Sequence, residues 1–294
     1  MNAEAGIWRE RLGKAIPIAL LVILTIPVVV GFIWIIISTF SHRTYGLEPQ
    51  GGLTLENWSF LWEDPHIWTV TLNTFVMSAG QTIGVVLVAS LAGYALSRIS
   101  FPGRKAFLGM TLILHAFPTV TLLIAIYFVL RWISTIPILG NDLPIIGGFG
   151  YNTLGGVIMV QLALQLPLGV WLMKGFFDNV SWDMQRAALI DGCGHFRVWW
   201  QIIMPSIRPG IAALSIFSFI SGWGAFLIPY TFIVDQKHSV LAAYIRGMLN
   251  ETAPVNYSAI AAVGLFQLLP VMIFFIFTQE YLMNIFSGGS KGGT

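Results

Sequence analysis

The sequence predicts an all-α membrane protein with six transmembrane helices, and two observations carry this prediction. The first is composition: of 294 residues, 56% are hydrophobic and only 10% are charged, and the mean hydropathy is +0.79. Soluble domains carry about 25% charged residues, so a chain this apolar would expose a large hydrophobic surface to water. The second is a series of six apolar stretches, each long enough to cross a bilayer as a helix of about 20 residues.

The six stretches are expected to be helical because lipid satisfies no free backbone group. In chain order they are 15–40, 69–97, 107–131, 153–173, 209–233 and 258–283. The first is too long for the hydrophobic region of a signal peptide, and no small-residue cleavage site follows it, so we expect it to be retained. The second carries small residues suited to close helix packing: Gly80, Gly84, Ala89, Ser90 and Gly93.

The distribution of Lys and Arg predicts that both termini lie in the cytoplasm. Eleven of the fifteen Lys and Arg residues fall in the N-terminus, the second loop, the fourth loop and the tail, and cytoplasmic loops carry such an excess. The predicted organisation is a cytoplasmic N-terminus 1–14, a membrane domain 15–283 and a flexible Gly-rich tail 284–294. The loop 174–208 is the only substantial cytoplasmic segment, so a cytoplasmic partner is expected to bind there.

Several absent patterns bear on the energy source. The sequence contains no P-loop with which to bind ATP. We also expect no predicted span to contain a buried Asp or Glu, the residues that ion-coupled transporters usually carry within the membrane. His115 is the one clearly ionisable residue at depth, no metal-ligand spacing or catalytic arrangement is evident, and the net charge of +2 gives no indication of nucleic-acid binding. These absences weigh against a secondary transporter and a membrane enzyme, and they indicate that any driving energy comes from another subunit.

The loop 174–208 predicts a helix–turn–helix elbow. Ser181 can cap a helix over Trp182–Ile190, and Gly192 can end it in a left-handed conformation. A second helix, His195–Ile203, is expected to end before Pro205. We expect Ala187 and Ala188 to be exposed on the first helix, where small side chains allow a partner to approach closely. The spacing alone fits an ordinary amphipathic connector equally well.

The residues of this elbow resemble a known motif. The segment reads Ala187-Ala188-x-x-Asp191-Gly192, then nine residues, then Ile202-x-Met204-Pro205. It resembles the E-A-A-x-x-D-G, nine residues, I-x-L-P loop of ABC importer permeases. Further matches resemble the carbohydrate-uptake branch, in particular the second permease of maltose-type systems, and the resemblance extends over roughly residues 70–293. These matches include Asn73-Thr74-Phe75, Ala92 to Arg98, Phe101 to Arg104, Phe117-Pro118 and Gly175-Phe176-Phe177.

The resemblance implies a type I ABC importer permease of a bacterial or archaeal inner membrane. A second homologous permease, two ATPase subunits that bind ATP and Mg²⁺, and an external solute-binding protein are the implied partners, with a sugar or sugar derivative as substrate. No cofactor, metal or catalytic residue is expected in this chain. The elbow residues implied to contact the ATPase are Arg186, Ala187, Ala188, Asp191, Gly192, Met204 and Pro205. Because Arg186 replaces the usual glutamate, we expect the ATPase to place an acidic residue opposite it.

Polar and aromatic side chains within the spans are candidates for the substrate pathway. They are Asn73, His115, Thr119, Gln161, Gln165, Trp223, Tyr230 and Gln267. Gln161 and Gln165 share one helix face, although amides in a membrane more often hold helices together. His115 with Thr119, and Trp223 with Tyr230, are each expected to lie on one helix, where hydrogen bonding or packing is the commoner role. A permease for another small solute and an ion-coupled transporter remain the alternatives.

Overall fold

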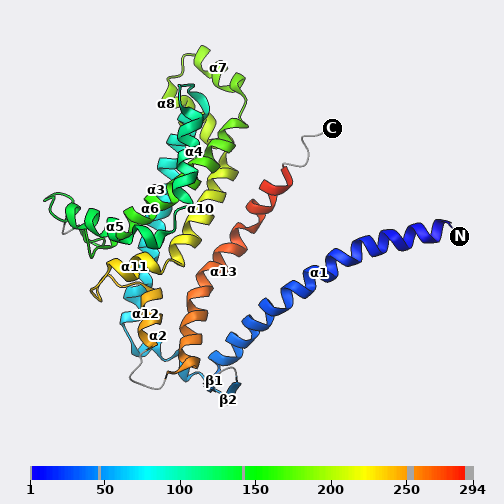
Figure 1. The fold of residues 1–294 in the computed structure, drawn as a ribbon, viewed down its shortest axis with the longest axis vertical. Coiled ribbons are helices and arrows are strands. Elements are labelled where there is room, and N and C mark those ends of the chain that lie inside the picture. Colours follow the sequence, from blue (N-terminus) through cyan, green and yellow to red (C-terminus); the bar gives the residue numbers. More distant parts are fainter. Residues whose placement is uncertain (1, 46–47, 141–142, 250–254, 289–294) are drawn as a thin grey trace. The chain divides into compact units, whose positions relative to one another are not determined.

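The computed structural model is mostly helical and describes residues 2–45, 48–140, 143–249 and 255–288 (Figure 1). It divides into two compact units. The first contains residues 1–65 and 247–269, and the second contains residues 66–246 and 270–294. The last helix, α13 (Tyr257–Gly288), contributes residues to both units.

The first unit begins with the long helix α1 (Asn2–Thr39), whose apolar side chains from Ile16 to Ile33 are exposed. An antiparallel hairpin of β1 (Ser41–Tyr45) and β2 (Glu48–Leu53) follows. Next come the short helices η1 (Glu56–Trp58) and α2 (Phe60–Glu63). Within this unit the buried Asn57 amide donates hydrogen bonds to the carbonyl oxygens of Thr39 and Ser41, so it fixes the hairpin to the end of α1.

The second unit is built around α3, which packs against α6 and α10. Its first helices are α3 (His66–Arg98), α4 (Arg104–His115), α5 (Thr119–Ile133) and α6 (Leu154–Asp178). The middle of the unit contains α7 (Trp182–Ile190), α8 (His195–Val198), the π-helical turn η2 (Trp199–Ile203) and α9 (Met204–Ser206). It continues with α10 (Arg208–Trp223), α11 (Leu227–Phe232) and α12 (Leu241–Met248), whose last two residues belong to the first unit.

The small residues of α3 lie against α6, as the sequence predicts. A Cβ added at Gly84 would overlap the side chain of Leu162, and one added at Gly80 would lie 3.0 Å from Ile158. At Gly93 an added Cβ would come within 2.9 Å of the Lys174 backbone nitrogen. Glycine therefore sets the close approach of these two helices, a device common in membrane proteins.

In the part of the chain that the structure describes, four helices are long and apolar enough to span a membrane, and the number reaches six if each of two bent helix pairs forms one span. The expectation of an unbroken third span at 107–131 is wrong, because α4 and α5 meet at an angle of 99°. Pro118 lies at the break in an extended conformation, and proline lacks an N–H and disfavours helix at the residue before it. The fifth predicted span, 209–233, is also interrupted, because α10 ends at Trp223 and α11 begins at Leu227.

The first and last helices each extend into a segment that the sequence predicts to lie outside the membrane domain. The first helix begins at Asn2, so the segment 2–14 is continuous with the first span. The last helix extends to Gly288, beyond the predicted end at residue 283. The rest of the predicted flexible tail, residues 289–294, lies outside the described residues.

Candidate functional site

In the elbow, residues 174–208, the structure contains the first of the two helices that the sequence predicts for this loop. Helix α7 runs from Trp182 to Ile190, and the Ser181 hydroxyl caps it by accepting a hydrogen bond from the Asp183 backbone N–H at 3.1 Å. Gly192 follows with a φ of +83°, the left-handed conformation that glycine adopts without strain. These boundaries follow from local sequence and are confirmed.

The second helical segment of the elbow continues further than predicted. It runs through the π-helical turn η2 and then through Pro205 to Ser206. Pro205 is the second residue of α9, which directly follows the π-helical turn η2. The prediction that the helix ends before Pro205 is therefore wrong.

The two faces of α7 have different surroundings. Gln185 and Ala188 are buried, and Ala188 packs in an apolar cluster that includes Val198 and Ile203. The expectation that both alanines are exposed is wrong for Ala188, because successive helical residues point about 100° apart and one of two neighbours turns inward. Ala187 remains exposed.

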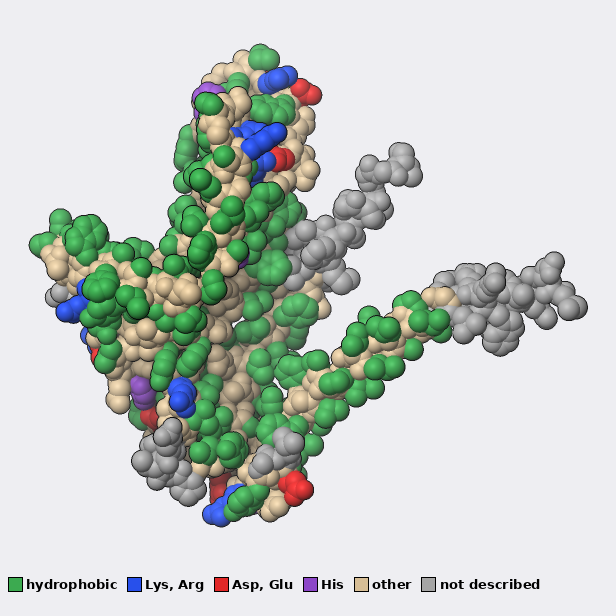
Figure 2. Space-filling view, in the orientation of Figure 1, with side chains coloured by type: hydrophobic (Ala, Val, Ile, Leu, Met, Phe, Trp, Pro, Cys, Tyr) green, Lys and Arg blue, Asp and Glu red, His purple; other side chains and the backbone are tan. Residues whose placement is uncertain are grey.

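The outward face of the elbow combines apolar and charged side chains. Ile190 is 85% exposed, and Arg186 makes only a 4.0 Å ion pair with Asp183, between two side chains that are largely in solvent. Figure 2 shows charged side chains grouped at the α7 and α8 end of the second unit, whereas the helices below are mainly hydrophobic. Of the other predicted coupling residues, Met204 is half-buried, while Asp191, Gly192 and Pro205 are exposed.

The base of the elbow is tied to α3 by the buried Arg98. Its Nη2 donates hydrogen bonds to the carbonyl oxygens of Phe177, at 3.0 Å, and Val180, at 2.7 Å. The guanidinium carbon also lies 4.6 Å from the ring centroid of Trp182, the first residue of α7. Beside it, the Ser97 hydroxyl donates to the carboxylate of Asp178 at 2.6 Å. We call these contacts the Arg98 clamp; the sequence reasoning assigned Arg98 no role in the elbow.

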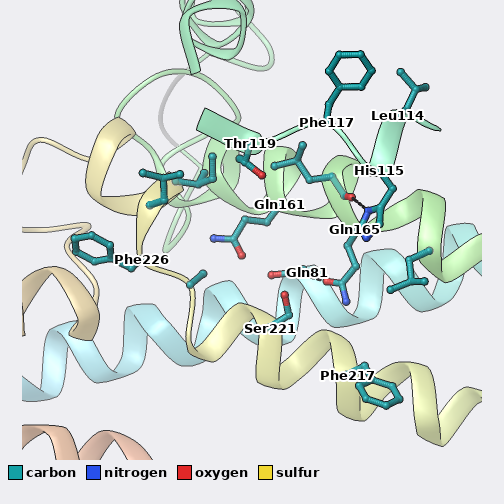
Figure 3. Close-up of a pocket in the computed structure, with 15 residues that line it drawn as sticks. Gln81, Leu114, His115, Phe117, Thr119, Gln161, Gln165, Phe217, Ser221 and Phe226 are labelled. Atoms are coloured by element: carbon teal, nitrogen blue, oxygen red, sulfur yellow. Dashed lines mark hydrogen bonds between the residues drawn. The ribbon is translucent and has the colours of Figure 1, made fainter. Parts of the chain in front are cut away.

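A cavity of about 550 Å³ lies between α3, α4, α5, α6, α10 and α11 (Figure 3). Four of the eight predicted pathway residues line it: His115, Thr119, Gln161 and Gln165. His115 ends α4 and Thr119 begins α5, so the expectation that they lie on one helix is wrong. Both residues nevertheless line the cavity. The cavity is also lined by Gln81, Leu114, Phe117, Leu164, Leu168, Phe217, Ser221, Ala225, Phe226, Leu227 and Ile228.

The polar groups of the cavity come from five different helices: α3, α4, α5, α6 and α10. The Gln81 amide nitrogen on α3 donates a hydrogen bond to the Gln165 side-chain oxygen on α6. The Gln161 amide nitrogen contacts the sulfur of Met77 at 3.4 Å. Figure 3 shows the side chains of Gln81, Gln161, Gln165 and Ser221 converging on one another. The site can therefore offer both hydrogen-bond donors and acceptors to a bound solute.

Gln81 and Ser221 are residues that the sequence reasoning missed. Gln81 lies between Gly80 and Gly84, in the stretch assigned only to helix packing. An amide in the middle of an apolar span was the available signal, because polar groups there are costly and often functional. Among the described residues, no group of three or more His, Cys, Asp and Glu is placed to hold a metal ion.

The other four pathway candidates do not line this cavity. The buried Asn73 amide donates hydrogen bonds to the carbonyl oxygens of Lys237, at 2.8 Å, and Ser239, at 2.9 Å. Gln267 belongs to the first unit.

The two aromatic candidates pack against neighbours within the second unit. Trp223 is buried and stacks on Phe219, and Tyr230 stacks on Phe226. The expectation that Trp223 and Tyr230 share one helix is wrong, because the chain leaves the helix at Gly224, a residue with low helix propensity.

Comparison with known proteins gives one family and a consistent set of relatives. The family model described as "Binding-protein-dependent transport system inner membrane component" matches residues 85–284. The chain is 29% identical to the diacetylchitobiose uptake system permease protein NgcG of Streptomyces coelicolor, with 98% of this chain and 92% of that protein aligned. It is 31% identical to the maltose/maltodextrin transport system permease protein MalG of Escherichia coli, with 75% and 71% aligned.

A solved structure has the same fold. It is a bacterial ABC transporter involved in the import of the acidic polysaccharide alginate. The similarity has a TM-score of 0.74 at 17% sequence identity and covers 92% of this chain and 96% of the matched chain. A second alginate transporter structure, in complex with a periplasmic protein that holds an alginate pentasaccharide, matches with a TM-score of 0.69 at 15% identity and covers 98% of each chain. The second unit with its elbow therefore belongs to a type I ABC importer permease fold.

Proposed function

Since this chain belongs to the family of binding-protein-dependent transport system inner membrane components, we propose that it is the permease subunit of an ATP-driven importer of a sugar or sugar derivative. It is a multi-pass inner-membrane transport subunit and not an enzyme. Its relatives include permeases for diacetylchitobiose and for maltodextrin, which supports a carbohydrate as the solute. We infer that both termini lie in the cytoplasm of a bacterial or archaeal cell, following the excess of Lys and Arg on that side.

The proposed assembly contains a second homologous permease, two ATPase subunits that bind ATP and Mg²⁺, and an external solute-binding protein. A related alginate transporter was solved with its solute-bound periplasmic protein, which supports the last partner. The solute crosses between the two permeases without chemical change. The ATPases supply the energy, because a ligand can shift a two-state protein only through different contacts with its two states.

The observation that carries this proposal is the construction of the elbow. Its outward face offers Ala187, Arg186 and the 85% exposed Ile190 to a partner. Its inward face is anchored, because Ala188 joins the apolar core and the Arg98 clamp fixes the start of α7. A rigid helix that is exposed on one side and anchored on the other can pass a movement of an ATPase to α3 and α6 as a rigid-body shift.

The cavity supports the solute assignment. Its polar lining consists of amide and hydroxyl groups together with His115, and phenylalanine side chains flank them. Small-molecule sites usually combine an apolar lining with a few converging polar groups in a volume of about 300–1,000 Å³. A sugar, with apolar ring faces and a rim of hydroxyl groups, matches such a lining.

The test is co-purification of the ATPase with paired isoleucine variants. Ile190→Asp on the elbow and Ile138→Asp on the loop after α5 change residues of equal exposure, 85% each. We expect Ile190→Asp to release the ATPase and abolish ATP-dependent sugar uptake in proteoliposomes, whereas Ile138→Asp retains the ATPase. Retention of the ATPase by both variants would overturn the docking site. Uptake that survives ATP depletion but collapses with an uncoupler would instead favour an ion-coupled transporter.

A further inference from the structure

We propose that the cavity of this chain binds an uncharged polyhydroxylated solute directly, with the side-chain oxygen of Gln81 accepting a hydrogen bond from a solute hydroxyl. This inference rests on the proposed function, since it assumes that the transported solute is a sugar. It goes further by assigning a solute-binding site to this subunit and by excluding anionic sugars from that site.

The first step is the unsatisfied oxygen of Gln81. The residue is 1% exposed, and its Oε1 finds no hydrogen-bond partner among the described residues. A buried acceptor without a partner is costly, and such groups in native structures call for an explanation. A solute hydroxyl that enters the cavity would supply the missing donor.

The second step is the orientation of this oxygen. The Gln81 amide nitrogen is engaged by the Gln165 side-chain oxygen across the α3–α6 contact, so the opposite edge of the amide carries the free oxygen. On the α10 side, the glycine at position 222 leaves room for the Gln81 oxygen. Any larger residue there would crowd it, because an added Cβ would lie only 2.7 Å from Oε1. Figure 3 shows this amide beside Gln161 and Ser221. The free oxygen is therefore held in place by the packing of three helices.

The third step is the match between the remaining polar groups and hydroxyls. The Gln165 amide retains donor N–H groups, since its oxygen accepts from Gln81, and the Gln161 oxygen remains an acceptor, since its nitrogen contacts Met77. The Ser221 hydroxyl can act in either role. A sugar hydroxyl donates one hydrogen bond and accepts others, so a set of mixed donors and acceptors suits it better than a set of one kind.

The fourth step is the absence of compensating charge. None of the fifteen described residues that line the cavity is Lys, Arg, Asp or Glu, and His115 is the one ionisable side chain among them. A carboxylate or sulfonate moved out of water needs an opposite charge or several strong donors to offset its lost hydration. Phe117, Phe217 and Phe226 offer apolar surface instead. The lining therefore selects an uncharged solute.

The experiment uses the complete transporter in proteoliposomes, with both permeases, both ATPases and the binding protein. The variants are Gln81→Met and Gln165→Met, which keep side-chain length but remove the amide. Gln279→Met is the matched control, because Gln279 is an exposed glutamine of α13 that does not line the cavity. The probes are diacetylchitobiose and maltotriose, which carry no charge, and an alginate trisaccharide, which does. The readouts are solute imported per ATP hydrolysed and ATPase stimulation by the binding protein.

We expect Gln81→Met and Gln165→Met to lower import of an uncharged probe per ATP by about tenfold, the factor for loss of one good hydrogen bond. ATPase stimulation by the binding protein should stay near the wild-type value, and Gln279→Met should import normally. If Gln81→Met fails to assemble, the more accessible Gln165 provides the same test.

Three results would overturn the inference in distinguishable ways. Normal import by both cavity variants would show that the solute bypasses this cavity, while the proposed function would stand. Equal import of the alginate trisaccharide and the uncharged probes by the wild-type transporter would overturn the restriction to uncharged solutes. Import by the wild-type transporter that survives ATP depletion but collapses with an uncoupler would overturn the proposed function itself, and with it this inference.

Discussion

The guanidinium group of Arg98 donates a hydrogen bond to the carbonyl oxygen of Val180 at 2.7 Å, and this contact joins the end of α3 to the start of the elbow. Val180 lies in the turn between α6 and α7, where backbone carbonyls have no helical partner. Arg98 therefore satisfies a buried acceptor and ties three helices together at one point. Any displacement of α7 must carry α3 with it or break this contact.

Arg98→Met is expected to destabilise the protein and to uncouple the elbow. The substitution leaves the carbonyl oxygen of Val180 without the donor that Arg98 supplies, at a cost of about 1–3 kcal/mol for a buried acceptor. The carbonyl oxygen of Phe177 also loses a donor but keeps the hydrogen bond from the Val180 backbone N–H. The thermal unfolding midpoint of the purified complex should fall, and less solute should be imported per ATP hydrolysed. Lys105→Met, which removes an exposed positive charge nearby, is the control. An unchanged unfolding midpoint and unchanged import per ATP in Arg98→Met would show that the Arg98 clamp neither stabilises the protein nor couples the elbow to α3.

Gly93→Ala and Gly175→Ala form a matched pair that tests the α3–α6 contact. A Cβ at Gly93 would come within 2.9 Å of the backbone nitrogen of Lys174, and a backbone atom cannot move aside cheaply. At Gly175 an added Cβ meets nothing within 4 Å, and alanine favours helix by about 1 kcal/mol. We expect a lower unfolding midpoint for Gly93→Ala and an equal or higher one for Gly175→Ala. The opposite order would refute the close approach at Gly93.

Local signals allowed much of the elbow to be predicted from the sequence. The Ser181 cap and the left-handed Gly192 act on their immediate neighbours, so the bounds of α7 follow from the residues themselves. The packing face of α3 was predictable for a similar reason. Gly80 and Gly84 lie one helical turn apart, and a strip of missing side chains lets another helix approach wherever that helix comes from.

Features that depend on tertiary contacts could not be read from the sequence. Pro118 is compatible with a kinked span or with a complete break, and the outcome depends on whether neighbouring groups satisfy the freed backbone. The inward turn of Ala188 depends on which face of α7 meets the apolar core. That the Gln81 side-chain oxygen has no hydrogen-bond partner among the described residues is visible only once α3, α6 and α10 are assembled around it.

Asn73→Leu is expected to loosen the loop between α11 and α12. The Asn73 amide holds the carbonyl oxygens of Lys237 and Ser239, and both bonds are lost when leucine replaces it. Two lost hydrogen bonds of about 1 kcal/mol each should raise the population of open loop by roughly tenfold or more. Trypsin cleavage after the exposed Lys237 should accelerate accordingly in the purified complex. Asn179→Leu makes the same change at an exposed position between α6 and α7, and it should leave the cleavage rate unchanged. Equal cleavage rates in the two variants would contradict the anchoring role of Asn73.

Arg186→Glu tests the charge reversal that distinguishes this elbow from the motif it resembles. The Arg186 side chain is 70% exposed and its 4.0 Å contact with Asp183 contributes little, so its charge is available to a partner. If the ATPase places an acidic residue opposite it, a glutamate here should repel that residue. The expected result is an ATPase affinity lowered by about tenfold or more, with a loss that shrinks as salt is raised.

Two controls separate this repulsion from other effects of the substitution. Lys105→Glu makes the same charge change at an exposed site outside the elbow, so it reports the influence of net charge alone. Arg186→Gln removes the positive charge without placing a second acidic group beside Asp183 on the same helix, and its affinity should fall between those of the wild-type and Arg186→Glu complexes. Assembly and coupling that are unaffected by Arg186→Glu would mean that Arg186 faces no acidic partner, and the docking contact would then depend on apolar residues such as Ile190.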